Sequence, residues 1–236
     1  MRAREQVYRM RLPRGLNPSF SAFGEDLLVR GWLDMFQVEP ANVRYLDIGA
    51  SHPSVLSNTY LLYRSGGSGV LVEPSAREAD LITRHRPRDT LVRAGVAFDE
   101  RREATFYEFT TSVFNTFNPD FATAMEQKPD AWAANERVRA KTVIGLVPAN
   151  DIISEHFSGR DCHFLSIDAE GVDDKIIASI DFDRFHPWFI CVEGHPNDGS
   201  PGVMHLRGRG YLVASITPSN TILASPERFR WLSGSP

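Results

Sequence analysis

Hydrophobic and polar positions follow one another along the chain in blocks that predict strands and helices in turn. Short, nearly unbroken apolar runs are typical of buried strands. They are VRYLDIGA (43–50), GVLVEP (69–74), TLVRAGVAF (90–98), HFLSIDAEG (163–171) and PWFICVEGHP (187–196). Apolar residues near helical spacing predict helices at 19–37, 57–65, 75–85, 172–180 and 200–209, and VIGLVPANDIISEHF (143–157) reads as an extended piece followed by a helix.

Strands that alternate with helices indicate parallel crossover units. The runs GVLV, FLSI and FICV contain almost no polar residue, as in strands that are covered on both faces. GYLVASI and TILAS, joined by the short TPSN region, predict a terminal antiparallel hairpin. We therefore expect an α/β protein with a doubly wound, mostly parallel sheet, helices on both faces and a hairpin at one edge.

The domain organisation follows from this pattern. We expect a basic N-terminal arm at 1–18 and a single domain at 19–236. Within it, ATFYEF (104–109) alternates and predicts an extra strand or hairpin arm. Residues 112–140 are the least regular part.

Charge and composition narrow the class of protein. The chain has 26 basic and 30 acidic residues in 236, a net charge of −4, which argues against nucleic acid as the main partner. Cys162 and Cys191 lie inside apolar runs, as expected of buried thiols in a reducing compartment. No apolar run approaches the ~18 residues of a membrane span. We expect a soluble cytoplasmic protein, and the sequence leaves its oligomeric state open.

Acidic residues, a glycine and a histidine stand at the ends of four of the predicted strands. Asp47 and Gly49 follow the first, Glu73 the second, Asp168 and Glu170 a later one, and Glu193 and His195 the next. In open α/β sheets, ligands bind beyond the carboxyl ends of the strands. If the strands are neighbours, these residues converge on the rim of one site.

The first half of this rim favours a nucleoside. Glu73 lies 26 residues after Asp47, roughly the spacing at which an acid on the second strand binds ribose hydroxyls. Gly49 would permit close backbone approach to a ligand. The segment DIGASHPS lacks the G-x-G-x-x-G of dinucleotide folds, so a nucleoside without phosphates, such as S-adenosylmethionine, fits better. An ordinary strand-end turn is the alternative.

Longer motifs carry a resemblance to a known family. YLDIGASHPSVLSNTYLLYRSGGSGVLVEPS (45–75) resembles the start of the FkbM-like S-adenosylmethionine-dependent methyltransferases. The helix that precedes the core in that family is similar to SFSAFGEDLL (19–28). Its later acidic strand ends are similar to FLSIDAEGVDDKIIASIDF and PWFICVEGHP, and its closing hairpin is similar to GYLVASITPSNTIL. The resemblance implies a class I, Rossmann-like methyltransferase fold. Relatives often carry Gln where this chain has Ala22.

The resemblance also implies roles for particular residues. Asp47 would lie near the methionine end of the cofactor and Glu73 at the ribose. Asn58 and Thr59, at an expected helix start, would donate to the cofactor carboxylate, or would simply cap the helix. Asp99 would reach the adenine amine. The full expected cofactor set is Asp47, Gly49, Ala50, Asn58, Thr59, Glu73, Pro74, Asp99 and Asp168.

Transfer of a methyl group to a hydroxyl requires removal of a proton. His195, which follows a central strand, is the expected general base, with His52 as the second candidate, because a histidine pKa lies near neutrality. Asp168 is the third expected catalytic residue. Alternatively, a divalent cation such as Mg²⁺ would orient the hydroxyl. Its expected ligands are Asp168, Glu170, Glu193 and His195. The competing interpretation is that Glu170 and Glu193 cap helices or pair with Arg207 or Arg209.

The resemblance points to O-methylation, of a sugar, oligosaccharide or glycolipid hydroxyl. Residues 112–142 would then form an acceptor-pocket or lid insertion, whose aromatic residues either pack or stack on a sugar ring. These aromatic residues are Phe114, Phe117, Phe121 and Trp132. Two rival functions remain: an NAD-dependent oxidoreductase or sugar epimerase, and a non-catalytic nucleotide-binding module.

Overall fold

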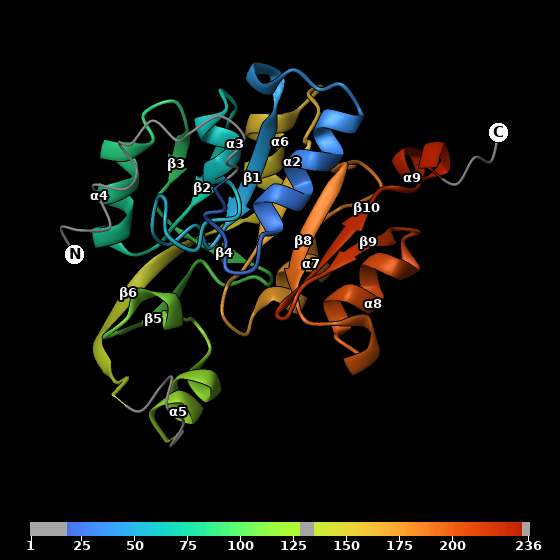
Figure 1. The fold of residues 1–236 in the computed structure, drawn as a ribbon. Coiled ribbons are helices and arrows are strands. Elements are labelled where there is room, and N and C mark those ends of the chain that lie inside the picture. The colour runs from blue at the N-terminus through green and yellow to red at the C-terminus, as the bar shows by residue number, and fades with distance from the viewer. Residues whose placement is uncertain (1–17, 128–134, 233–236) are drawn as a thin grey trace.

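The computed structural model describes residues 18–127 and 135–232, so the predicted arm at 1–18 lies almost wholly outside the described part. A seven-stranded sheet with the order β3-β2-β1-β7-β8-β10-β9 forms its centre (Figure 1). Only β10 runs against the other six strands. The strands are β1 (Arg44–Ile48), β2 (Ser68–Val72), β3 (Thr90–Val92), β7 (Phe164–Ile167), β8 (Phe189–Glu193), β9 (Leu212–Ile216) and β10 (Asn220–Ala224).

Helices cover both faces of this sheet, as the alternating pattern predicted. Side chains of α6 (Ala149–Phe157), α7 (Asp173–Ser179) and α8 (Pro201–Gly208) pack into one cluster. Those of α2 (Glu25–Met35), α3 (Tyr60–Arg64) and α4 (Ala76–His85) contribute to the other. The remaining described helices are α5 (Pro119–Gln127), α9 (Pro226–Leu232) and the short 3₁₀ turns η1 (Pro40–Asn42), η2 (Ser112–Phe114) and η3 (Pro196–Asp198).

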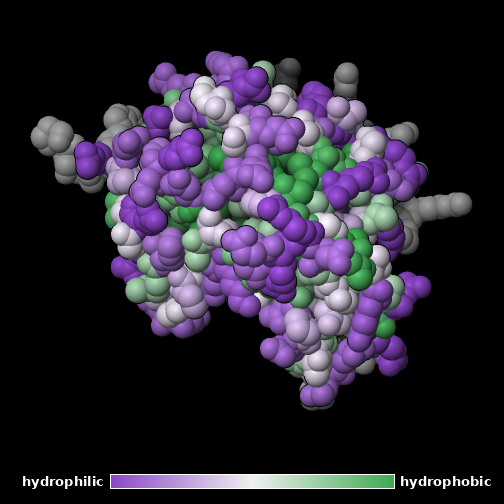
Figure 2. Space-filling model, turned by 180° about the vertical axis from the view of Figure 1, so that it is seen from behind, coloured by the Kyte–Doolittle hydropathy of each residue, from purple (hydrophilic) through white to green (hydrophobic). Residues whose placement is uncertain are grey.

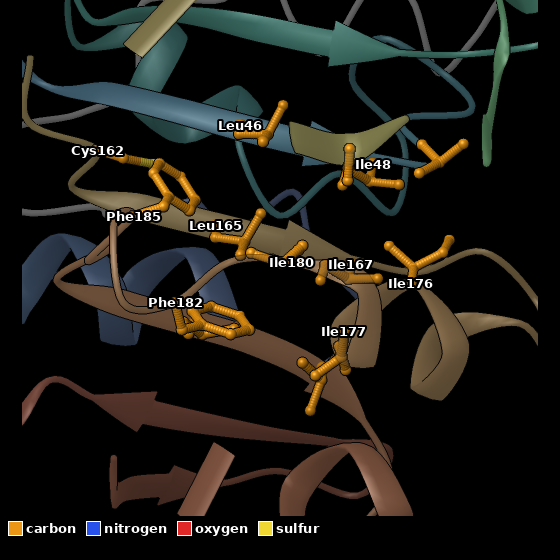
Figure 3. Packing of buried hydrophobic residues seen from close by; sticks show 14 of the residues in the cluster. Leu46, Ile48, Cys162, Leu165, Ile167, Ile176, Ile177, Ile180, Phe182 and Phe185 are labelled. Atoms are coloured by element: carbon orange, nitrogen blue, oxygen red, sulfur yellow. The ribbon is translucent and has the colours of Figure 1, made fainter. Parts of the chain in front are cut away.

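Alternation along each strand sends side chains to the two clusters in turn. On β1 and β7, Leu46, Ile48, Leu165 and Ile167 belong to the first cluster. Figure 3 shows these side chains on the same side of the sheet as Ile176, Ile177 and Ile180. The residues between them point to the other face of the sheet. There Asp47 of β1 lies beside Ser166 of β7, and Ser166 lies beside Cys191 of β8. A polar row therefore crosses three neighbouring strands.

One predicted strand, 90–98, is wrong as a single element. It divides into β3 in the main sheet and β4 (Gly95–Ala97), which pairs with β6 (Val138–Pro148) in a second sheet of order β4-β6-β5. β5 (Glu103–Phe109) is the predicted extra strand, antiparallel to β6. Residues 112–142 are more regular than expected, since they contain α5, and the β5–β6 hairpin with α5 extends away from the main sheet (Figure 1).

Local hydrogen bonds explain where helices begin. The helix predicted from residue 19 begins at Glu25, because the Asp26 carboxylate accepts from the Ser19 hydroxyl and the Phe20 N–H and holds that segment in a turn. Helix α4 begins after Ser75, whose hydroxyl donates to Glu78 three residues later. The Asp26 contacts account for the first helix start, which apolar spacing alone misplaces, whereas α4 begins where the sequence predicted.

The surface seen from behind is mainly hydrophilic with a hydrophobic area near its middle (Figure 2). Within the described ranges, no helix is both long enough and apolar enough to cross a lipid bilayer.

Candidate active site

A cavity of about 250 Å³ opens at the carboxyl ends of the parallel strands. Asp47, Glu73, Asp168 and Glu193, which come from four different strand ends, all line it. The convergence expected from the sequence is therefore present in the structure. Gly49, Ala50, Asn58, Pro74 and Glu170 of the predicted set line it as well.

Glu73 is held in place by the main chain. Its two carboxylate oxygens accept from the N–H groups of Ser51 and Ser75, each at 2.7 Å. Burial raises the pKa of Glu73 to about 7, although these two hydrogen bonds oppose the shift. Each oxygen keeps a further lone pair for a ligand.

The Ser51 hydroxyl, next to the Glu73 site, makes no hydrogen bond within the protein. Ser51 lines the cavity with φ +46°, and its hydroxyl oxygen is buried with no protein partner. A buried hydroxyl without a partner is costly, so this atom fits a ligand group that hydrogen-bonds there. The ribose hydroxyls of a nucleoside that reaches Glu73 would provide such a group.

The second half of the rim is a group of carboxylates without protein donors. Within the described chain, the side chains of Asp168, Glu170 and Glu193 accept no hydrogen bond from any residue. Burial raises the pKa of Asp168 and Glu170, and the neighbouring carboxylates raise it further. Such a group favours a positively charged ligand, which would restore ionisation.

The turn that carries Asp168 and Glu170 is fixed by hydrogen bonds to a side chain at the start of α7. Asp173 accepts from the N–H groups of Ala169 and Gly171, and so fixes the 168–171 turn, in which Glu170 adopts φ +49°. The competing interpretation of Arg pairing is wrong for Arg209, which pairs with Asp183 at 2.7 Å. Arg207 contacts the Met204 sulfur.

The irregular segment docks onto this turn. The Thr116 hydroxyl donates to the Glu170 carbonyl at 2.6 Å, and the Asn118 amide donates to that of Gly171 at 3.0 Å. Phe117 lines the cavity with Phe106, their ring centroids 4.7 Å apart. The other expected aromatics differ: Phe114 and Phe121 pack on the small cluster of Phe109, Ala122 and Met125, and Trp132 lies outside the described residues.

Neither predicted histidine lines the cavity. His195 Nε2 donates to the Thr217 carbonyl at 2.8 Å, and its Nδ1 lies 3.5 Å from Asp198. His52 Nδ1 accepts from the N–H groups of Ser54 and Val55. The geometry therefore gives no support to either ring as a proton acceptor.

Two expected cofactor contacts, Asp99 and Thr59, do not line the cavity either. Asp99 is exposed and pairs with Arg101 at 2.7 Å, on the edge of a different hollow. Thr59 is fully buried, and although it precedes α3 its hydroxyl does not cap that helix. It donates to Asp47 instead.

The expected metal site finds no support in the geometry. In the ranges 18–127 and 135–232, no group of three or more His, Cys, Asp or Glu side chains is placed to hold a metal ion. His195 is turned toward Thr217, which removes one of the four expected ligands.

Sequence reasoning missed a link between the start of α2 and the β9–β10 turn. Glu25 accepts from Thr217 at 2.7 Å and from the Asn220 amide at 2.9 Å. Asn220 lines the cavity together with Ala22, so this link places the N-terminal turn and the β9–β10 turn at the site. The run Gly24-Glu25-Asp26 at an expected helix start was the available signal.

The fold is a mostly parallel α/β sheet of the Rossmann-like type, with an antiparallel hairpin at its C-terminal edge. The model of the methyltransferase FkbM domain matches residues 47–213, more than half of the chain, so this chain belongs to the FkbM methyltransferase family. No curated protein matches the chain at a significant level.

Among solved structures, one similar chain is titled "Putative methyltransferase yhhF from Escherichia coli". It is 11% identical, the match covers 91% of this chain and 92% of that one, and the TM-score is 0.41. At this level of likeness it carries no argument about the site.

Proposed function

We propose that this S-adenosylmethionine-dependent methyltransferase transfers a methyl group to a hydroxyl, in a sugar, oligosaccharide or glycolipid. The observation that carries the proposal is the charge of the cavity. Five acidic residues, Asp47, Glu73, Asp168, Glu170 and Glu193, line it against one basic side chain, Arg101, among the described residues. Arg101 is itself paired with Asp99.

This charge favours the methyl donor over a dinucleotide. S-adenosylmethionine carries a sulfonium and an ammonium, which a rim of unpaired carboxylates attracts. The pyrophosphate of NAD would bring negative charge into the same cavity, where the described residues offer neither a glycine-rich cradle nor an unpaired basic side chain. The same comparison weighs against the oxidoreductase or epimerase alternative.

The residues present fit the donor in named positions. Glu73 and the unpaired hydroxyl of Ser51 suit the ribose, and Asp47 suits the methionine ammonium. The bound donor supplies an activated methyl group on sulfur. The chain then has to align the acceptor and remove its proton.

Asp168 is the proposed proton acceptor. It lies at the end of β7, it has no protein donor, and a cationic ligand nearby would return it to the ionised form that accepts a proton. Phe106 and Phe117 offer a sugar ring an apolar face at the side of the cavity formed by the insertion.

Two measurements test the proposal. Calorimetry should show binding of S-adenosylmethionine and not of NAD. Turnover to S-adenosylhomocysteine should then appear with members of a panel of saccharide acceptors and depend on the acceptor's free hydroxyl. Binding of NAD alone, or transfer only to amine or carboxylate acceptors, would overturn the proposed function.

A further inference from the structure

One arginine is buried beneath the cavity without reaching it. Arg86 follows α4 and is 1% exposed. Its Nε donates to Asp89 at 2.7 Å, and its guanidinium lies 5.3 to 6.0 Å from the ring centroids of Tyr45, Tyr60 and Tyr63. Burying a charge is costly, so a fully enclosed arginine calls for a reason beyond its one ion pair.

Arg86 acts on the cavity through Thr59. Both terminal nitrogens of Arg86 donate to the Thr59 hydroxyl at 3.0 Å, and that hydroxyl donates to Asp47 Oδ2 at 2.5 Å. A guanidinium only donates, and a threonine hydroxyl has one proton. The direction of the chain is therefore fixed, and Asp47 has to be an acceptor at its end.

A second pair of polar residues, Asn58 and Ser166, lies next to the Asp47 carboxylate. The Asn58 amide donates to the Ser166 hydroxyl at 3.1 Å, and Ser166, which lies opposite Asp47 on the neighbouring strand, lowers the Asp47 pKa. Thr59 and Ser166 both favour the ionised form of Asp47 from the protein side, while Asp47 also lines the cavity. Hydrogen bonds in such chains strengthen one another in a buried setting.

We infer that Arg86, acting through Thr59, is a positioning residue that holds Asp47 as an ionised acceptor facing the ammonium of the methyl donor. This inference rests on the proposed role of Asp47. It assigns Thr59 to the relay and not to contact with the cofactor, in agreement with its complete burial.

The charges around Asp47 show why the relay matters. Burial raises the pKa of Asp47, and the charge of Asp89 raises it further; the titratable side chains of Asp168, Glu73 and Cys191 lie on the elements packed around it. Arg86 and Thr59 lower this pKa. Without the relay the Asp47 pKa rises further, so binding of a cationic donor would require higher pH.

Thr59→Val removes the hydroxyl with little change of shape and leaves Arg86 paired with Asp89. We expect S-adenosylmethionine to bind on the order of tenfold more weakly at neutral pH, the loss of a hydrogen bond to a charged group. The pH at which this affinity rises should be higher in Thr59→Val than in the wild type. Thr59→Ser should restore both properties, and Thr59→Val should add nothing in an Asp47→Asn background.

Thr83→Val is the matched control. The Thr83 hydroxyl also accepts from an arginine, Arg93, at 3.1 Å and donates to an oxygen, that of Ala79, at 2.9 Å, but it lies on α4 away from the cavity. Its loss should leave the affinity and the pH profile unchanged.

A ligand-free readout separates this inference from the proposed function. A ¹³C titration of the Asp47 carboxyl, assigned by comparison with Asp47→Asn, should show a higher pKa in Thr59→Val. If Thr59→Val does not fold, Arg86→Lys takes its place and should shift the pKa in the same direction by less. An unchanged Asp47 pKa overturns the relay whatever the protein binds. A raised pKa with no binding of S-adenosylmethionine by the wild type would sink the proposed function and the cofactor-positioning role with it.

Discussion

The carbonyl oxygen of Asp168 lies 1.8 Å from the point that a Cβ atom on Gly49 would occupy. The two residues follow the adjacent strands β1 and β7, and Gly49 has φ +84°. The sequence suggested that this glycine lets a ligand approach. In the structure it lets the neighbouring strand end approach, which brings Asp47 and Asp168 to one cavity.

Gly49→Ala should therefore destabilise the fold and distort the site together. The positive φ costs about 1–2 kcal/mol for a residue with a Cβ, and the contact with a backbone atom adds to it. We expect a loss of about 3 kcal/mol in chemical unfolding, with weaker binding of S-adenosylmethionine. Gly145→Ala on β6, where a Cβ would meet nothing within 4 Å, should change neither.

The sequence predicted the strand ends well, for a physical reason. Buried parallel strands need unbroken apolar runs, so the acids that interrupt them mark the rim. Asp47, Glu73, Asp168 and Glu193 were found in this way and share the cavity.

What the sequence could not give depends on three-dimensional neighbours. The direction of the His195 ring depends on the Thr217 carbonyl, and the burial of Arg86 depends on tyrosines from other elements. The split of 90–98 depends on β6, which comes later in the chain and pairs only with Gly95–Ala97 of the run. Local pattern carries none of this information.

Glu73 should give S-adenosylmethionine binding a pH dependence near neutrality. Its pKa in the protein is about 7, above the ordinary 4.5, and ribose hydroxyls donate to the ionised form. The affinity should fall as the pH drops through about 7. Glu73→Gln should weaken binding on the order of tenfold at pH 8 and remove this step, measured by calorimetry from pH 6 to 8. A step that persists in Glu73→Gln would assign it to another group.

Thr116→Val should slow turnover more than it weakens cofactor binding. The variant removes the hydrogen bond that holds the Glu170 carbonyl and so loosens the 168–171 turn. We expect kcat to fall on the order of tenfold, since small misplacements of a reacting group are costly. The control is Thr123→Val on α5, whose exposed hydroxyl donates only to Pro119. Equal kinetics for the two variants would contradict a role for this docking.

Chelation should leave methyl transfer intact. The acids of the rim do not gather three or more metal ligands in the described chain, and a cationic donor compensates their charge without a metal. We expect the same rate of S-adenosylhomocysteine formation in EDTA and in Mg²⁺. Loss of activity in EDTA that Mg²⁺ restores would return the metal hypothesis to consideration.

Asp168→Asn and His195→Ala together identify the proton acceptor. Asp168→Asn preserves the size of the side chain and removes its capacity to take a proton, so kcat should fall by about 10²–10⁴. Affinity for S-adenosylmethionine, measured separately, should change by much less, because Asp47 and Glu73 remain. His195→Ala should keep kcat within a few-fold, since the ring is engaged with Thr217 and does not line the cavity. The reverse ranking would assign the proton to His195 and would require its ring to leave Thr217 when the acceptor binds.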